Sequence, residues 1–403
     1  MRPFPLLDGY RAIAAFMVLT THVAFNTGEI LTPVIGPVLG RMDFGVTLFF
    51  LLSGFLLYRP WARAAMVDRS GPPLGGYALR RAARILPAYW VMVAFTLLLL
   101  PEIQPVRWQA WPVHLGMLHI YVPGFTLEGL TQTWSLATEI AFYAVLPLLA
   151  WIAGRGGRGN PDASARYQLA VLAIVIALAW IFTVMRVSGG LGTSLLSAYW
   201  LPGFLDWFAL GMAAAVIQVR LSMPSAPAWM LSLRQIASAT GWCLLIAAAL
   251  AVIAATPIAG PLTFDPAEPN SLVIKHLLYG VIAAFLLLPG FLGIGDISDP
   301  GHVRSSIWGR MLASPVAVYL GTISYGVFLW HLVLLRFIQN ALGLQVFAGG
   351  FWIVWPLVVL ASIAFASASW FVLERPVLNW AHRRTGRDVA PRVPPARPQP
   401  SAR

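Results

Sequence analysis

The sequence contains little cysteine, little lysine and little charge of any kind. Cys243 is the only cysteine among 403 residues, and it lies within an apolar run. One cysteine alone excludes a disulfide framework, a cysteine metal cluster and a thiol-based mechanism built on it. Charged residues make up 10% of the chain, whereas a soluble domain carries roughly 25%. The composition therefore excludes an ordinary soluble protein.

Long apolar stretches take the place of the missing charge. Hydrophobic residues account for 59% of the chain. We predict an all-α polytopic integral membrane protein with about ten transmembrane helices, each long enough to cross a hydrocarbon core of about 30 Å, the first being an uncleaved N-terminal helix. The predicted spans are 9–27, 43–59, 83–101, 133–152, 168–187, 199–219, 236–257, 273–294, 316–339 and 350–372.

Arginines concentrate in alternate connections between these spans. The connections 60–82 and 153–167 are rich in arginine, whereas 188–198 and 258–272 contain none. Under the positive-inside rule, this alternation places both the N- and C-termini in the cytoplasm and explains the formal charge of +12 without a nucleic-acid partner. We predict a transmembrane domain over 1–376 and a basic, proline-rich, disordered cytoplasmic tail over 377–403.

Arg11 and His22 lie in the first predicted helix, eleven residues apart. Eleven steps of about 100° return to within about 20° of one direction and rise about 16 Å. The two side chains therefore share one stripe of the helix, about half a membrane apart. Ionisable groups inside a membrane are costly and usually functional, so we interpret this pair as part of the site.

Three other ionisable residues are predicted at the depth of His22. Glu139, Asp206 and His331 lie on three further spans, each in the outer half of the membrane. Each could be a core polar group satisfied by a neighbour, but four at one level favour a polar cavity. A histidine beside a carboxylate is a general acid–base arrangement, so we predict that Glu139 orients His22.

Two histidines in the connection 102–132 are interpreted differently. His114 and His119 are five residues apart, a poor spacing for shared metal ligation on one helix face. We favour interfacial packing for both, and we predict no metal site.

The predicted cytoplasmic face carries a cluster of arginines. Arg81 and Arg84 share one face at a helix N-terminus, where the helix dipole and two guanidinium groups suit phosphate. Arg11 reaches the same surface, although the positive-inside rule alone explains the arginines equally well. Ser53 could bond a ligand or its own helix, and Gly54 allows close approach of a ligand or another helix.

The motifs occur in a definite order along the chain. They are Arg11 and His22, 49–55 (FFLLSGF), 81–87 (RAARILP), 134–139 (WSLATE) with Phe142 and Tyr143, and 323–325 (ISY) with Trp330 and His331. In this order, from Leu7 to Pro376, the chain resembles the acyltransferase-3 family of bacterial membrane O-acyltransferases. One departure is Ile140, because many members have a second acidic residue directly after the one at the Glu139 position.

The resemblance implies a stand-alone enzyme of the bacterial cytoplasmic membrane, without an SGNH domain. Such an enzyme transfers an acyl group, often acetyl, from cytoplasmic acyl-CoA to a hydroxyl of a sugar, glycolipid or macrolide. The implied partners are acyl-CoA as co-substrate, a glycolipid or sugar acceptor and membrane lipids, with no bound cofactor.

Together these arguments give a hypothesis for the site. His22 is the predicted base, oriented by Glu139, although an acyl-histidine intermediate is equally compatible with the sequence. The predicted acyl-CoA contacts are Arg11, Arg81, Arg84, Ser53 and Gly54, and the predicted acceptor pocket contains Tyr325, His331, Asp206 and Trp134. The alternative hypothesis is a transporter or flippase of a lipid-linked sugar, which would also place charges inside the membrane.

Overall fold

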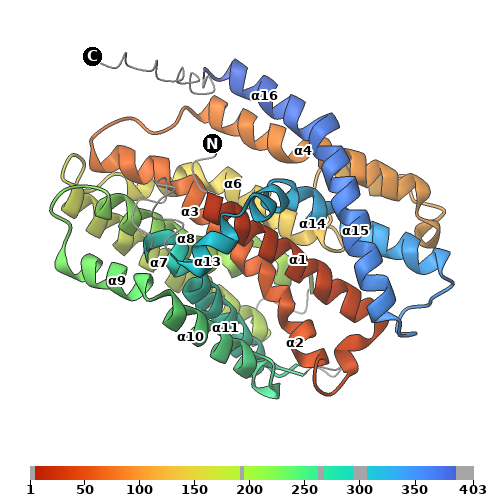
Figure 1. Ribbon diagram of the computed structural model, residues 1–403. Helices are drawn as coiled ribbons and strands as arrows, with labels where there is room; N and C mark the ends of the chain where they lie inside the picture. Colours follow the sequence, from red (N-terminus) through yellow and green to blue (C-terminus); the bar gives the residue numbers. More distant parts are fainter. Residues whose placement is uncertain (1–4, 191–194, 262–266, 294–305, 387–403) are drawn as a thin grey trace, which may run out of the picture.

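The computed structural model describes residues 5–190, 195–261, 267–293 and 306–386, and every regular element within those ranges is a helix (Figure 1). The predicted all-α fold is confirmed. The long helices are α1 (Pro5–Thr27), α3 (Gly45–Met66), α4 (Leu74–Leu99), α6 (Thr133–Ala153), α7 (Pro161–Val187), α8 (Leu205–Leu221), α10 (Thr240–Ala254), α11 (Pro269–Leu288), α14 (Pro315–Ala341) and α15 (Phe351–Ser369).

Short helices connect or extend the long ones. The α-helical ones are α2 (Gly36–Arg41), α5 (Ala110–Leu115), α9 (Ala228–Ser238), α13 (Ile307–Leu312) and α16 (Arg375–Arg384). The 3₁₀ turns are η1 (Glu29–Leu31), η2 (Met42–Phe44), η3 (Pro101–Ile103), η4 (Leu195–Tyr199), η5 (Leu201–Phe204) and η6 (Pro257–Ala259). Two π-helical turns, η7 (Pro289–Gly293) and η8 (Trp370–Glu374), extend α11 and α15.

The number of membrane-spanning helices differs from the predicted ten. Among the described residues, eight helices are long and apolar enough to cross a membrane, or nine if α9 and α10 form one span bent by 74°. The helix α1 is also long, at 23 residues, but polar side chains such as Arg11, His22 and Asn26 make it less apolar. Each predicted span coincides with one of these helices, and the seventh is broken. The chain is a multi-span membrane protein.

The helix α1 lies inside the bundle, against α3, α14 and α15 (Figure 1). Most of its residues are buried on all sides, as expected for a central helix. Its contact with α14 depends on Gly321, where an added Cβ would collide with the backbone of Asp8. Small residues allow this close approach of helices in a membrane, where packing replaces the hydrophobic effect. The central position of α1 brings Arg11 and His22 into the interior.

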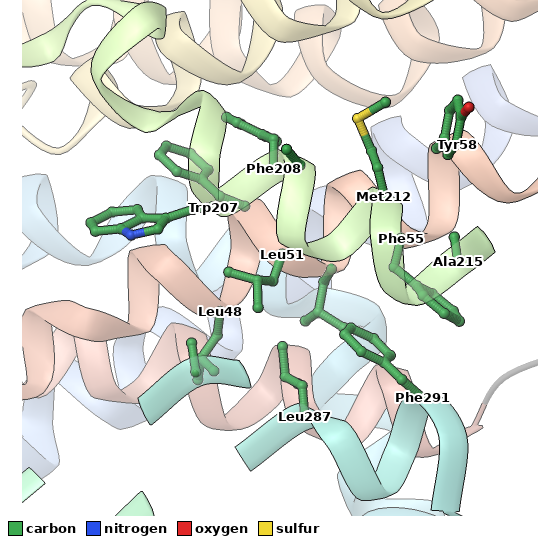
Figure 2. Packing of buried hydrophobic residues seen from close by; sticks show 14 of the residues in the cluster. Leu48, Leu51, Phe55, Tyr58, Trp207, Phe208, Met212, Ala215, Leu287 and Phe291 are labelled. Atoms are coloured by element: carbon green, nitrogen blue, oxygen red, sulfur yellow. The ribbon is translucent and has the colours of Figure 1, made fainter. Parts of the chain in front are cut away.

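The helices α3 and α8 are also in close contact, through two glycines. A Cβ on Gly54 would overlap the carbonyl oxygen of Phe208, and one on Gly211 would overlap that of Leu51. Large side chains from α3, α8, α11 and η7 pack around this contact (Figure 2). Of the two uses predicted for Gly54, the structure therefore shows helix packing.

The end of the domain also differs from the prediction. Residues 375–384, of which 377–384 were expected to be disordered, form α16, which packs along α4 (Figure 1). The rest of the predicted tail, from 387 onward, lies outside the described residues. In the connection 102–132, the structure forms the short helix α5, and turns follow it.

Candidate functional site

Cavities lie at both ends of α1: two that share lining residues at one end, and a further pocket at the other. The first, which we call the arginine cavity, lies between α1, α3, α4, α6 and α14, where α1 contributes Arg11 and α4 contributes two arginines. Its polar lining residues are Arg11, Ser53, Arg81, Arg84, Ser135, Glu139, Tyr143, Ser324 and Tyr325. The structure thus brings together five of the residues predicted for the donor site or catalysis, together with Tyr325.

The arginine cavity continues into a wider pocket of about 500 Å³, which we call the arginine vestibule. Arg11, Arg81 and Arg84 line both spaces. The helix α16 adds Arg375 and His382 to the vestibule. Four guanidinium groups around one opening give a strongly positive electrostatic field that favours anionic ligands. The sequence hypothesis omitted Arg375 and His382 because it assigned most of α16 to a disordered tail.

Arg84 is held in position by a buried carboxylate. Its Nη1 lies 3.6 Å from Oε2 of Glu374, which is 1% exposed. Ser369 donates a hydrogen bond to the other oxygen of Glu374 over 3.1 Å. The guanidinium also lies over the ring of Tyr325, 5.7 Å from its centroid. Tyr325 itself donates to the carbonyl of Ile85, so it belongs to the arginine cavity and not to the acceptor pocket in which it was predicted.

Glu139 also lies in the arginine cavity, away from His22. It accepts hydrogen bonds from the hydroxyl groups of Ser53 and Tyr143, the latter over 2.7 Å. The predicted contact between Glu139 and His22 is therefore wrong. The depth argument placed both side chains at one level, but it did not fix the direction in which each helix presents them.

His331 occupies the position beside His22 that was predicted for Glu139. Its Nε2 lies 3.0 Å from Nδ1 of His22, and the two ring centroids are 5.0 Å apart. His331 is fully buried on α14, whereas His22 is half-buried and lines a cavity at the far end of α1. His331, which was predicted for the acceptor pocket, therefore lies behind His22 and does not line the cavity that His22 lines.

The hydrogen-bond network assigns the protons of this pair. Nδ1 of His22 lies 2.9 Å from the carbonyl oxygen of Val18, and Nδ1 of His331 lies 2.7 Å from that of Phe328. Because a carbonyl oxygen only accepts, each Nδ1 must carry a proton. Nε2 of His331 then accepts from Nδ1–H of His22, which is shared with Val18. This leaves Nε2 of His22 unprotonated and able to accept a proton.

The cavity at this end, the histidine pocket, has a volume of about 370 Å³. It is lined by His22, Asp43, His114, His119, Trp134 and Tyr199, among others. Trp134 therefore faces the same cavity as His22, and its ring lies 5.2 Å from that of Tyr199.

Asp43 brings a carboxylate to the histidine pocket that the sequence hypothesis did not include. Lys275 donates to it over 2.9 Å, and Tyr279 donates to its other oxygen. Neither partner was singled out from the sequence. The signal available was the position of Asp43, directly before the apolar run of α3.

Asp206, predicted for the acceptor pocket, lies elsewhere. Its carboxylate is 2.8 Å from Nε2 of His276, whose ring stacks on Trp207 with centroids 4.3 Å apart. Asp206 lines neither the arginine cavity nor the histidine pocket. Its partner is the neighbouring histidine of α11, as the alternative interpretation of a satisfied core polar group allowed.

Comparison with known proteins gives a consistent set of relatives. A family model described as an acyltransferase domain matches residues 4–371. The chain is 24% identical to the putative peptidoglycan O-acetyltransferase YrhL of Bacillus subtilis (strain 168), over 96% of this chain and 57% of that protein. It is 21% identical to nodulation protein 10 of Rhizobium leguminosarum bv. viciae, over 92% of each chain.

A third relative matches over a shorter stretch. The chain is 28% identical to the peptidoglycan O-acetyltransferase OatA of Listeria monocytogenes serovar 1/2a over 37% of this chain and 25% of that protein. This chain therefore spans little more than half of YrhL and a quarter of OatA. No solved structure matches.

Proposed function

The chain belongs to the acyltransferase-3 family, and we propose that it transfers an acyl group, most simply acetyl, from acyl-CoA to a hydroxyl of a cell-envelope sugar. Its family and the names of two relatives, which are peptidoglycan O-acetyltransferases, support this activity. The observation that carries the proposal is the histidine pair, which leaves an unprotonated nitrogen of His22 on the wall of one cavity.

The donor binds at the arginine end in this proposal. Coenzyme A carries several phosphate groups, and Arg11, Arg81 and Arg84 line both the vestibule and the cavity beyond it. Arginine forks bind phosphate oxygens in pairs, which fixes the orientation of the donor. The arginine end faces the cytoplasm, where acyl-CoA is found and where the positive-inside rule places arginines. The protein is then a multi-pass protein of the bacterial cytoplasmic membrane.

The thioester reaches His22 by extending through the arginine cavity. Phe328 lines this cavity, and its carbonyl accepts the hydrogen bond from His331, so it lies between the cavity and the histidine pair. Along α6, Glu139 faces the arginine cavity and Trp134 faces the histidine pocket. Five residues of helix correspond to about 7.5 Å, which an extended pantetheine arm spans when the side chains that separate the two cavities move apart.

His22 then acts as the general base. Its Nε2 accepts the proton of the acceptor hydroxyl while the oxygen attacks the thioester carbonyl. The imidazolium keeps Nδ1–H directed at Val18 and His331, which stabilises the new charge. When the carbon–sulfur bond breaks, the same Nε2 proton passes to the departing thiolate, so the base is regenerated. This route needs no second carboxylate beside Glu139.

The acceptor binds in the histidine pocket. Trp134 and Tyr199 offer flat apolar faces there, and Asp43 offers a carboxylate to hydroxyl groups. Pockets that combine aromatic walls with a few placed polar groups fix both affinity and orientation. An envelope glycan or glycolipid is the proposed acceptor, and a macrolide is the second choice.

The proposal is tested with purified protein in lipid nanodiscs, radiolabelled acetyl-CoA and soluble peptidoglycan glycan chains. The wild-type protein is expected to move label onto the glycan as an alkali-labile ester. The His22→Ala variant is expected to bind acetyl-CoA normally and to lose transfer. If the label remains on CoA while a lipid-linked sugar crosses the bilayer, the protein is a transporter and the proposal is wrong.

A further inference from the structure

A second pair of histidines, His114 and His119, lines the histidine pocket together with His22. His114 is the penultimate residue of α5 and His119 follows five residues later, both in the connection between α4 and α6. Their rings are stacked, with centroids 5.0 Å apart and planes inclined by 13°. They are 1% and 6% exposed. Nothing in the catalytic scheme above uses either side chain.

The stacking results from the way in which α5 ends. The amide of Leu118 donates to the carbonyl of Val113, and that of Met117 donates to His114, which together form a Schellman motif. Met117 occupies the left-handed position with φ of 56°, where glycine is usual. The chain therefore reverses directly after α5, and His119 folds back onto His114.

Three nitrogens of this pair have no partner within normal hydrogen-bond geometry among the described residues, although the backbone of Phe125 lies close enough to His114 to favour its protonated form. They are Nδ1 and Nε2 of His114 and Nδ1 of His119. Nε2 of His119 is 3.1 Å from the hydroxyl oxygen of Thr133, whose own proton goes to the carbonyl of Leu130. Nε2 of His119 must therefore carry the proton, which leaves its Nδ1 as an unused acceptor. Buried polar groups of this kind normally have a partner.

Both imidazoles are uncharged at neutral pH. Burial lowers the pKa of His114 to about 3, with the neighbouring His119 as a further cause and a backbone interaction at Phe125 in partial opposition. Burial likewise lowers the pKa of His119 to about 4. Each ring is therefore a neutral donor and acceptor.

This chemistry selects one kind of ligand. The free Nδ1 of His119 needs a donor, so an anion such as phosphate, which only accepts, cannot satisfy it. His114 presents one donor and one acceptor in its neutral form. Hydroxyl and amide groups supply both, and the carboxylate of Asp43 in the same pocket also accepts from hydroxyls. The matching ligand is neutral and rich in hydroxyl groups.

We propose that His114 and His119 form, with Asp43, the subsite that recognises the hydroxyl and amide groups of the sugar acceptor. This inference rests on the proposed function, because it names what the acceptor contacts beyond the reacting hydroxyl. The unpartnered nitrogens are covered in this conformation, so the imidazoles turn toward the acceptor when it binds. The pair determines acceptor affinity and specificity, and His22 retains the chemistry.

The test uses the double variant His114→Phe/His119→Phe, which keeps two stacked rings and removes the nitrogens. In the nanodisc assay, KM for the glycan is expected to rise about tenfold or more, equivalent to about 1.4 kcal/mol. KM for acetyl-CoA and kcat at saturating glycan are expected to change less than threefold. Because the unpartnered nitrogens are gone, Tm of the free protein is expected to rise. Leu118→Ala, an exposed residue of the same loop, is the matched control.

Two results would overturn the inference. If the double variant has a raised Tm and an unchanged KM for the glycan, the histidines only pack, and the proposed function stands without them. If the wild-type protein itself transfers no acetyl group to any glycan, the proposed function fails and the subsite fails with it. A second variant, His119→Asn, restores a hydrogen-bonding group and is expected to recover part of the glycan affinity.

Discussion

Nδ1 of His22 and Nε2 of His331 lie 3.0 Å apart, so that each imidazole fixes the proton position of the other. Two backbone carbonyls, of Val18 and Phe328, anchor the outer ends of this arrangement. In the proposed mechanism, the role that a carboxylate plays in many acid–base sites is taken by the imidazole of His331. The pair can hold a single tautomer without introducing a negative charge into the core, where an unpaired charge would be costly.

The first prediction concerns this pair. His331→Ala removes one of two acceptors for Nδ1–H of His22 and is expected to lower kcat by about 10- to 100-fold, which is part of the roughly 10²- to 10⁴-fold that a positioned base contributes. KM for acetyl-CoA should stay constant, as measured by initial rates in nanodiscs. His331→Gln, whose side-chain oxygen can accept the same hydrogen bond, should recover part of kcat. An effect on KM alone would place His331 in substrate binding instead.

The second prediction concerns the donor. Arg84→Ala is expected to raise KM for acetyl-CoA by about tenfold or more, since a charge-assisted hydrogen bond contributes about 1.5–3 kcal/mol. The difference in KM between the wild-type protein and the variant should become smaller with a dephospho-CoA donor and at higher salt. Either change weakens the contacts between arginine and phosphate. Arg166→Ala, on a different surface of the molecule at the start of α7, is the control. An Arg84→Ala variant with normal donor KM would exclude Arg84 from donor binding.

The third prediction concerns Glu374, which holds Arg84. Glu374→Gln removes the buried negative charge and leaves the guanidinium 3.6 Å from an amide. Breaking a buried ion pair by removing one partner typically costs about 3–5 kcal/mol, and because Arg84 is partly exposed we expect the lower part of that range or less. Thermal unfolding should show a reduced Tm, together with a weaker affinity for acetyl-CoA. Glu102→Gln, an exposed carboxylate at η3, should leave both unchanged.

The fourth prediction concerns helix packing. Gly211→Ala places a methyl group against the backbone of Leu51, and overpacking of this kind costs about 1–3 kcal/mol. Gly75→Ala is the matched control, because it lies in α4 with open space around it. It should stabilise the protein by up to about 1 kcal/mol through the better helix propensity of alanine. Equal Tm changes in the two variants would argue against close packing of α3 and α8.

The fifth prediction concerns pH. The pKa values of His114 and His119 are lowered by folding to about 3 and about 4, from about 6.5 in an unfolded chain. Below pH 6.5 the unfolded chain therefore binds protons that the folded protein does not, and stability falls with decreasing pH down to about 4. The wild-type protein should lose Tm in this range more steeply than His114→Phe/His119→Phe. If Tm falls with pH equally steeply in the wild-type protein and the double variant, neither histidine is buried in its neutral form.

Much of the arginine end could be predicted from the sequence. Helical periodicity and charge distribution suffice to place Arg11, Arg81 and Arg84 on one surface. The predicted helix N-terminus at Arg81 and Arg84 is wrong, because α4 begins at Leu74 and both arginines lie about two to three turns inside it, beyond the reach of the helix dipole. Glu374 could also have been singled out, because it lies at the end of the stretch that resembles the family, two residues before Pro376.

The histidine end was harder to predict, because it depends on which way each helix turns its side chains. His22, Glu139, Asp206 and His331 were correctly placed on four helices, but only His22 and His331 meet. Depth follows from chain position, whereas rotation about the helix axis is set by packing contacts such as those of Gly54 and Gly211. No single-sequence pattern encodes those contacts.

The loop histidines show a second limit. A spacing of five residues places two side chains far apart on a continuous helix. The helix α5 ends between His114 and His119, and the left-handed Met117 folds one ring onto the other. Gly116 hints at a helix end here, but the left-handed position is occupied by Met117, where methionine is unusual, so the sequence does not predict the reversal.

The arginine cavity and the histidine pocket share no lining residue among those described, and Phe328 with the buried His331 lies between them. In an energised bilayer, such an apolar partition acts as electrical insulation. Moving one charge across 100 mV releases about 2.3 kcal/mol, so a continuous watery path would short-circuit the proton gradient. In the proposed function, this partition lets the enzyme use substrates from both compartments while the cell keeps its membrane potential.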